Sequence, residues 1–288
     1  MLQNSAALAL GSTVILNSPF SILSNKQNAK TRVVLIRDEK LFDTSGTINE
    51  QVLSKMLDDA VMKLTDNTTA ANAWSSIIKP ADVVGVKTNT WPSFPTPPVL
   101  EKIIKTRVLA AGVKETDLSI KDQPVKTDPV FLRSTALINV RPMRAHAWSG
   151  VGSMLKNYII FLPEPSSIHG DSCADLAQIW SRPELKGKTR LNILVMITPL
   201  FHIVGSNYYN KEYTWPYNGL IVGFDPVAVD STGLRIIQAK RKEYFKEDRP
   251  LNPPAKHIEL ADTRHHLGTS DPAKIDLVKM GWTESIYI

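Results

Sequence analysis

Two kinds of hydrophobic pattern alternate along the chain. Short apolar runs, which are typical of buried strands, occur at residues 31–36, 82–87, 118–121, 190–198, 220–224 and 275–278. Between them, apolar side chains recur at helical spacing at residues 49–64, 69–78, 97–111, 171–180 and 255–265. Residues 136–140 fit another strand, and residues 153–161 fit either a strand or a helix. This alternation predicts an α/β protein, a three-layer sandwich whose largely parallel or mixed central sheet is flanked by helices.

The junction at residues 219–237 is the clearest of these patterns. The apolar run 220–224 ends at Asp225-Pro226, and a helical pattern follows at once. Asp225 suits the N-cap of that helix, and Pro226 suits its first position. Open α/β sheets usually bind ligands at the carboxyl ends of their strands, so Asp225 is also a candidate functional group. Asp230 lies a little over one helical turn further on.

Polar residues also follow other apolar runs. Lys87 ends one run and is followed closely by Asn89, Asp122 follows a second run, and Thr198 ends a third. If these strands are parallel neighbours, their polar ends meet Asp225 at one edge of the sheet. A lysine beside two carboxylates would then form the ion-paired floor of a pocket, with shifted pKa values. The alternative is that each residue only terminates a strand or caps a helix.

Two further segments concentrate polar side chains. Residues 145–157 contain His146, Lys156 and Asn157, together with glycines that let a backbone approach a ligand closely. Lys156 and Asn157 would hold an oxyanion or a carbonyl group. His169 precedes a predicted helix and would act as an acid, a base or a metal ligand. A structural histidine with satisfied hydrogen bonds is the alternative for His146 and for His169.

The composition narrows the classes of function. A chain of 288 residues can bury a large core, and no internal repeat or low-complexity linker divides it. Cys173 is the single cysteine, which excludes an internal disulfide and an iron–sulfur cluster held by this chain's own cysteines. The net charge of +6 is spread out and basic residues are not interleaved with aromatic ones, so no nucleic-acid partner is expected. The chain contains no GxSxG, HExxH, Walker or GxGxxG motif.

The first 30 residues differ in character from the rest. Residues 5–16 are small and apolar, and a largely polar stretch separates them from the first predicted strand. This segment is too short to span a bilayer, but it fits the apolar part of an export signal. It looks like the remnant of a twin-arginine signal whose basic start lies upstream of Met1, although an ordinary first helix or strand is the alternative. We therefore expect residues 1–30 to be a signal remnant and linker, residues 31–288 to form a single α/β domain, and the protein to be exported to the periplasm.

At these residues the chain resembles a known family, the domain-of-unknown-function family numbered 362, whose proteins are often described as iron–sulfur-centre proteins. The resemblance covers roughly residues 31–280 and is carried by the segments AWSSIIKPADVVGVKTN, AAGV, HAWSGVGSMLKN, HGDSCADLAQIW, LIVGFDPVAVD and HHLG. It implies an α/β fold without a settled reaction. Some members carry a cysteine-rich ferredoxin-like segment, which this chain lacks, and many are exported by the twin-arginine route. Members commonly have glycine soon after the Lys-Asn pair, where this chain has Tyr158-Ile159.

Together these patterns predict an exported enzyme that acts on a small anionic or oxygenated metabolite in a pocket at the strand ends. Its expected catalytic residues are Lys87, Lys156 and His169, its ligand-binding residues Asn89, His146, Asn157 and Asp122, and its metal-binding residues Asp225 and Asp230. A divalent metal is the cofactor that these residues suggest. The main alternative is a non-catalytic protein that holds a metal or another ligand in the same pocket; another is a structural module. No stable membrane span is expected in the mature chain, and the oligomeric state stays open.

Overall fold

A computed structural model describes residues 30–205 and 209–288 of the chain. The apolar segment at residues 5–16, expected to belong to an export signal, lies outside the described residues. None of the described helices combines the length and the apolar character needed to cross a membrane.

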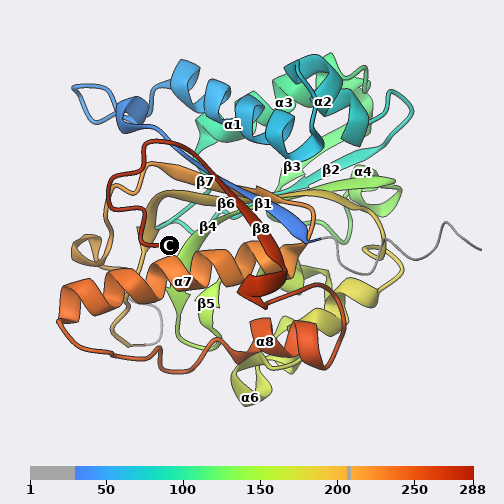
Figure 1. Cartoon of the computed structure of the whole chain (residues 1–288). Coiled ribbons are helices and arrows are strands. Elements are labelled where there is room, and N and C mark those ends of the chain that lie inside the picture. The colour runs from blue at the N-terminus through green and yellow to red at the C-terminus, as the bar shows by residue number, and fades with distance from the viewer. Residues whose placement is uncertain (1–29, 206–208) are drawn as a thin grey trace, which may run out of the picture.

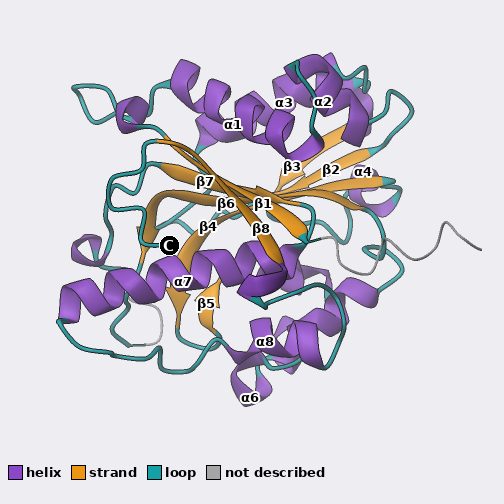
Figure 2. Cartoon of the chain, in the orientation of Figure 1, coloured by secondary structure: helices purple, strands orange, loops and turns teal. Residues whose placement is uncertain are grey.

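One mixed sheet forms the middle layer of the molecule (Figure 2). Its strand order is β3-β2-β4-β6-β7-β1-β8, and β5 pairs with the end of β4. Neighbouring strands along this order are parallel except at β7, which runs antiparallel to both β6 and β1. The strands are β1 (Thr31–Arg37), β2 (Val84–Lys87), β3 (Leu118–Lys121), β4 (Ala136–His146), β5 (Gly150–Gly152), β6 (Thr189–Leu200), β7 (Gly219–Gly223) and β8 (Ile275–Gly281).

Helices cover both faces of the sheet, which confirms the three-layer α/β sandwich predicted from the sequence (Figure 1). Helices α1, α2 and α3 lie on one face, and α7 lies on the other with α8 and the short helices α5 and α6. The helices are α1 (Glu50–Thr65), α2 (Ala70–Ile77), α3 (Pro98–Ala110), α4 (Pro129–Leu132), α5 (Met154–Asn157), α6 (Gly170–Cys173), α7 (Pro226–Phe245) and α8 (Lys256–Thr263).

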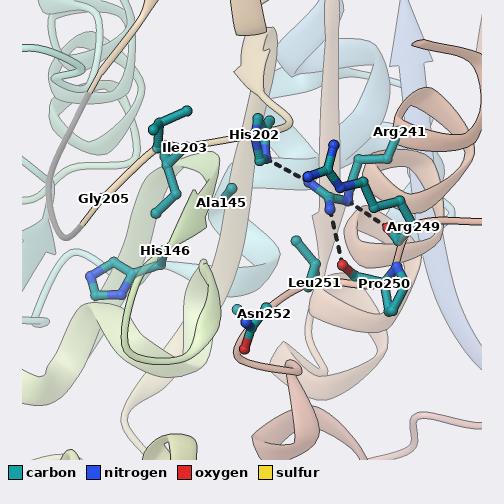
Figure 3. A pocket seen from close by; sticks show the side chains of 12 residues that line it. Ala145, His146, His202, Ile203, Gly205, Arg241, Arg249, Pro250, Leu251 and Asn252 are labelled. Carbon is teal, nitrogen blue, oxygen red and sulfur yellow. Dashed lines mark hydrogen bonds between the residues drawn. The ribbon is translucent and has the colours of Figure 1, made fainter. Parts of the chain in front are cut away.

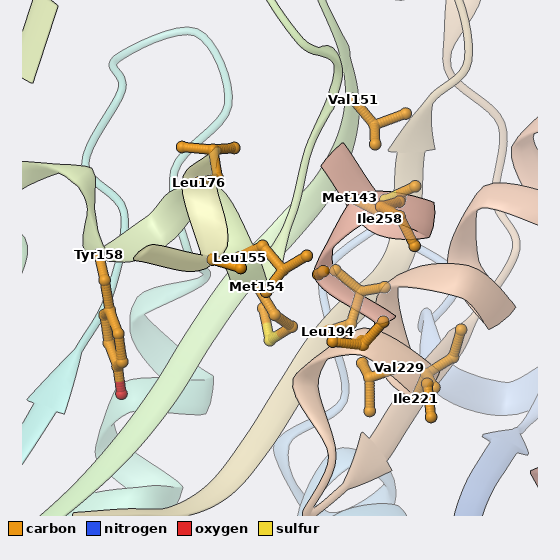
Figure 4. Close-up of a cluster of buried hydrophobic side chains, with 14 of the residues drawn as sticks. Met143, Val151, Met154, Leu155, Tyr158, Leu176, Leu194, Ile221, Val229 and Ile258 are labelled. Carbon is orange, nitrogen blue, oxygen red and sulfur yellow. The ribbon is translucent and has the colours of Figure 1, made fainter. Parts of the chain in front are cut away.

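Each face of the sheet has its own apolar core, because successive side chains of a strand point to opposite faces. In β1, Val34 and Ile36 belong to the core under α1–α3, whereas Val33 and Leu35 belong to the core under α7. Figure 4 shows part of the second core, which joins side chains of the sheet, α5, α7 and α8 and includes Leu155, Leu194, Ile221, Val229 and Ile258.

The segment at residues 171–180 is not the single helix that its pattern predicts. Helix α6 ends at Cys173, and a 3₁₀ turn follows at Leu176–Ser181. Asp171, Ser172 and Cys173 have left-handed backbone, with φ of 50°, 58° and 61°. A continuous right-handed helix cannot contain such residues, so that prediction was wrong.

The middle of the chain settles two ambiguous patterns. The strand expected at residues 136–140 continues as β4 to His146, and its last residues pair with β5. Residues 153–161 form helix α5 followed by a 3₁₀ turn at Tyr158–Phe161. Lys156 and Asn157 therefore lie on a single helical turn that follows directly from the β4–β5 hairpin.

The direction of β7 determines where Asp225 lies. Its register pairs Gly219 with Met196 and Gly223 with Asn192, so β7 runs toward the start of β6. Lys87 and Asp122, in contrast, stand at the ends of the parallel strands β2 and β3. Asp225 does not share their edge of the sheet, and the expectation that all these polar ends meet was wrong.

Asp225 instead is the N-cap of α7, as its sequence context predicts. Its Oδ1 accepts hydrogen bonds from the backbone N–H of Val227 at 2.8 Å and of Ala228 at 3.1 Å. Its Oδ2 accepts one from the N–H of Thr269 at 2.8 Å, in the loop that leads to β8. Both carboxylate oxygens are thus engaged by the backbone of the fold.

Replacing this cap should destabilise the protein in two separable steps. We expect Asp225→Ala to lower the free energy of unfolding by about 2 kcal/mol, because it removes the helix cap and the acceptor for Thr269. Asp225→Ser keeps a capping oxygen, and we expect it to lose only about half as much. Urea denaturation of the two variants checks this, and equal stability of Asp225→Ala and the wild type would contradict the structural role.

Candidate functional site

Lys87 and Asp122 form a buried ion pair at the ends of β2 and β3. The Lys87 Nζ donates to Asp122 Oδ1 at 2.5 Å and to the carbonyl of Thr88 at 2.8 Å. Asp122 Oδ2 accepts from the N–H and the hydroxyl of Thr90, both at 3.0 Å. Burial lowers the pKa of Lys87 to about 8 against the opposing effect of Asp122. Burial also opposes ionisation of Asp122, but Lys87 and Thr90 hold its pKa below the ordinary value.

A chain of buried amides connects this ion pair to the centre of the sheet. The Asn157 Nδ2 donates to the carbonyls of Lys87 and Val140, both at 3.1 Å, and to Asn139 Oδ1 at 2.8 Å. Asn139 Nδ2 in turn donates to Asn192 Oδ1 at 3.0 Å. Asn157, expected to bind ligand, therefore ties α5 to β2 and β4 through its amide nitrogen. Its Oδ1 faces the Lys87 Nζ and the Arg141 Nη1, each at 3.5 Å.

Asp230 holds the other side of α5. Its side chain is fully buried, and its two oxygens accept from the backbone N–H groups of Met154 at 2.8 Å and Leu155 at 2.9 Å. Burial raises the pKa of Asp230 to about 7, although these hydrogen bonds favour its charged form. Asp230 is therefore a positioning residue for the helical turn that carries Lys156 and Asn157.

The metal interpretation of Asp225 and Asp230 gains no support from this geometry. Both oxygens of each carboxylate accept hydrogen bonds from backbone N–H groups. Within residues 30–205 and 209–288, no group of three or more His, Cys, Asp or Glu side chains is placed to hold a metal ion.

Three buried cations lie close to this chain of amides. Arg141 and Arg144 come from β4 and Lys156 from α5, and each side chain is less than 10% exposed. The two arginines lie close to Gly152 of β5. A Cβ added to this glycine would lie 3.3 Å from Arg141 Nη2 and 3.5 Å from Arg144 Nε. The same Cβ would lie 3.3 Å from His146 Cδ2, so glycine at this position keeps room for the cluster. We call Arg141, Arg144, Lys156, His146 and His169 the cationic cluster.

The local shape of β4 makes this convergence possible. Its pairing with β6 is irregular between Pro142 and Arg144. An irregularity of this kind bends a strand and changes the direction of its side chains. Arg141 and Arg144, three residues apart, can therefore both approach Gly152 although a regular strand would point them to opposite faces.

Among the described residues, no carboxylate forms an ion pair with Arg141, Arg144 or Lys156. Nε of Arg141 and Nε of Arg144 are buried and have no hydrogen-bond acceptor in the described parts of the chain. Burial lowers the pKa of Arg144, and the neighbouring Arg141 guanidinium lowers it further. Burial also lowers the pKa of Lys156 to about 8, with a further lowering by Arg141. A guanidinium stays charged in proteins, so the cluster carries a surplus of buried positive charge.

Two aromatic side chains border the cluster. Trp91, in the loop after β2 that also holds Asn89, stacks on the Arg144 guanidinium at 4.0 Å. Trp148, at the tip of the β4–β5 hairpin, lies with its ring centroid 4.4 Å from that of His169. Trp148 is 46% exposed, so it separates the cluster from solvent without being part of the core.

His146 and His169 are both neutral imidazoles in this environment. Burial and the nearby cations Lys156, Arg144 and Arg141 lower the pKa of His146 far below its ordinary value. Burial and Lys156 lower the pKa of His169 as well. The His146 Nδ1 accepts from the backbone N–H of Trp148 at 3.2 Å, which leaves its proton on Nε2.

Lys156 differs from Lys87 in its partner. Its Nζ lies 3.5 Å from the sulfur of Cys173, and no carboxylate is paired with it in the described part of the chain. The Cys173 Sγ in turn lies 3.4 Å from the carbonyl of Trp148. Burial raises the pKa of Cys173, so the thiol offers Lys156 only a weak, neutral partner.

The structure thus brings the expected residues together in two adjoining groups. Lys87, Asp122 and Asn157 form the framework, and Lys156, His146 and His169 join two arginines that the sequence analysis missed. The missed signal is the segment NVRPMRAH at residues 139–146, in which polar residues recur every second or third position of a strand. Asn89 lies in the neighbouring loop, where its buried Oδ1 has no hydrogen-bond partner among the described residues.

Removing one Asp230 oxygen should loosen α5 specifically. Asp230→Asn sets an amide NH₂ against a backbone N–H donor, so we expect the free energy of unfolding to fall by about 2 kcal/mol. In hydrogen exchange, the amides of Met154 and Leu155 should become less protected while those of β2 keep their protection. The exposed Glu259→Gln variant, with the same chemical change on α8, should behave like the wild type. Unchanged protection of Met154 and Leu155 in Asp230→Asn would show that Asp230 does not position α5.

Comparison with known proteins gives a family and no close relative. The family model described as "Domain of unknown function (DUF362)" matches residues 41–235, which include every strand from β2 to β7 and all the residues of the cationic cluster. No curated protein and no solved structure matched the chain. The match covers more than half of the sequence, and the chain belongs to the DUF362 family of proteins with a domain of unknown function.

Proposed function

We propose that this protein is an enzyme that acts on a small anionic metabolite bound by the cationic cluster. The observation that carries the proposal is the burial of Arg141, Arg144 and Lys156 together without an acidic partner of their own in the part of the chain that the structure describes. Buried charge is strongly unfavourable unless it is compensated, and a bound carboxylate or phosphate would supply the compensation. Arginine also matches the planar geometry of such anions with two parallel hydrogen bonds.

Lys156 is the residue we expect to take part in chemistry. Its pKa of about 8 lets the amine gain or lose a proton near neutral pH, which suits a general acid or base. A perturbed pKa that arises from burial and a neighbouring charge is typical of functional sites. Protonated Lys156 would polarise a carbonyl or hydroxyl oxygen of the substrate, and neutral Lys156 would accept its proton.

Lys87 and His169 receive different roles in this proposal. Lys87 is paired with Asp122 and hydrogen-bonded to the amide chain, so it supports the site and contributes positive charge. His169 is neutral, its buried Nδ1 has no protein partner in the described residues, and it lies close enough to Lys156 to feel its charge. In this proposal, His169 relays a proton to or from Lys156.

We also propose that the protein acts after export from the cytoplasm. The support is the small apolar segment at residues 5–16 and its separation from the first strand by a polar linker. Fractionation of cells that produce the full chain tests this, and recovery of the protein in the cytoplasmic fraction alone would contradict it.

Loss of one cluster arginine should weaken anion binding. A thermal-shift and calorimetric screen of phosphate, sulfate and short carboxylates is expected to yield ligands that stabilise the wild type. Arg144→Met removes the charge and the guanidinium that stacks on Trp91 but keeps an apolar side chain, and we expect it to bind these ligands about 10- to 100-fold more weakly, equivalent to about 1.5–3 kcal/mol. Exposed Lys114→Met is the charge-matched control and should bind normally.

The outcomes of that screen separate the alternatives. Equal anion affinity of Arg144→Met and the wild type would refute the proposed site. Specific binding without turnover of any oxygenated or carbonyl-containing ligand would favour the non-catalytic binding protein instead. Turnover that is lost in Lys156→Met even at ligand concentrations that saturate the variant would support the enzyme.

The pH dependence of binding should follow Lys156. As the pH rises through about 8, the amine loses its proton and the cluster loses one positive charge. The protonated fraction of such a group falls about tenfold between pH 7 and pH 9, and anion affinity should fall with it. Lys156→Met should bind more weakly at pH 7 and show a flatter profile, measured by calorimetry at each pH. A wild-type affinity that is constant from pH 7 to pH 9 would contradict the role of Lys156.

A further inference from the structure

A cavity of about 350 Å³ lies beside the β4–β5 hairpin (Figure 3). Its wall includes His146 from the hairpin, His202 from the segment after β6, Arg241 from α7, and Arg249 from the loop after α7. Among the described residues, none that lines it is acidic. This described lining combines basic side chains with backbone and apolar groups and holds no side chain that would repel an anion.

Arg241 organises one side of this cavity. Its guanidinium is buried, and it donates to the carbonyls of Arg249 at 3.2 Å, Phe201 at 3.1 Å and Pro250 at 3.0 Å. All three partners are neutral carbonyls, so these bonds fix the loop after α7 without neutralising the charge. The positive charge of Arg241 is available to a ligand by field even though its N–H groups are occupied.

Arg241 also determines which ring nitrogen of His202 carries the proton. Arg241 Nη1 lies 3.0 Å from His202 Nδ1, and arginine can only donate, so the histidine nitrogen accepts. The proton of neutral His202 must then be on Nε2. Burial and the positive charges of Arg241 and Arg249 lower the pKa of His202, which keeps the ring neutral at physiological pH. His146 has the same arrangement, since its Nδ1 accepts from Trp148. Both histidines on this wall are therefore set as Nε2–H donors.

Arg249 adds a cation at the exposed rim. Its guanidinium stacks on the Phe245 ring at 4.6 Å, and the side chain is exposed. This contact orients a charged group beside the cavity while leaving its N–H donors open to solvent or ligand. An exposed side chain of this kind can be changed without disturbing the core.

The cavity and the cationic cluster share one residue, His146 of β4. His146 lines the cavity and belongs to the cluster, and Arg144 precedes it by two residues on the same strand. Two residues of a strand span about 7 Å along its axis. A ligand held at Arg144 therefore needs only a short chain to reach the His146 side of the cavity, which His202 and Arg249 also line.

We propose that this cavity binds a second anionic group of the ligand, which makes the ligand class a short dianion such as a dicarboxylate. The proposal rests on the proposed function, in which the first anionic group occupies the cationic cluster. In this arrangement Arg141 and Arg144 bind one carboxylate near Lys156. The second carboxylate accepts hydrogen bonds from His202 Nε2–H and lies in the field of Arg241 and Arg249. The two subsites together select for charge at both ends of the ligand.

The test compares ligands that differ by one charge at constant length. Calorimetry is carried out with succinate, glutarate and adipate and with the half-amide of each. For the length that fits best, we expect the wild type to prefer the dicarboxylate over its half-amide by about tenfold. Arg249→Met removes the charge and the guanidinium that stacks on Phe245 but keeps an apolar side chain at this exposed position, and it should reduce that preference to about threefold or less. Lys242→Met removes a cation from the same end of α7 outside the cavity lining and should keep the wild-type preference.

The variants distinguish failure of this inference from failure of the proposed function. A wild type that binds each dicarboxylate no better than its half-amide, or an Arg249→Met variant that keeps the full preference, would overturn the second subsite. Arg144→Met should weaken the dicarboxylate and the half-amide alike, because both need the cationic cluster. If Arg144→Met changes neither, the proposed function fails, whatever Arg249→Met does.

Discussion

The contact between Asp230 and the first turn of α5 decides the geometry of the whole site. A carboxylate buried in α7 accepts the N–H groups of Met154 and Leu155, and this fixes the turn that presents Lys156 and Asn157. Asn157 then reaches the carbonyl of Lys87 and the amide of Asn139. An unpaired N–H in this interior would be unfavourable by about 1–3 kcal/mol, so helix α7, helix α5 and strands β2 and β4 are held in one arrangement. The framework of the site is consequently built on sheet and helix contacts, whereas Asn89, Asp122, His169 and the aromatic border lie in the loops between them.

This framework explains how the fold tolerates its buried cations. Burial lowers the pKa of Arg141, and the charges of Asp122 and Asp230 both oppose this lowering, although each carboxylate accepts its hydrogen bonds from other groups. Among the described residues, neither carboxylate forms an ion pair with Arg144 or Lys156, so they offset only part of the charge of the cluster. The result is a site that is stable enough to fold yet still carries more positive than negative charge. Such preorganised charge binds an anion without reorganising the protein around it.

The sequence predicts the layers of this fold better than the identity of its site. Strand and helix patterns identify the sheet and α1, α3 and α7, because buried runs and amphipathic stripes follow directly from the side chains. The direction of β7 is not encoded in the same way, since an apolar run such as LIVG reads alike in a parallel and an antiparallel strand. This is why Asp225 was expected beside Lys87. Arg141 and Arg144 were missed because the irregular pairing near Pro142 breaks the two-residue period that would show them on one face.

The left-handed turn at Asp171–Cys173 shows that the site is also supported from α8. Left-handed backbone is unfavourable by about 1–2 kcal/mol for each residue that is not glycine, and here three such residues follow one another. Lys256 of α8 is paired with Asp171 at this turn, and Arg264 and His265 are paired with Asp175 at 2.9 Å. The turn places the Cys173 thiol, rather than a carboxylate, against the Lys156 amine. An acidic residue in that place would form an ion pair with Lys156, as Asp122 does with Lys87. Burial lowers the pKa of both lysines to about 8, and among the described residues only Lys87 of the two has a carboxylate partner.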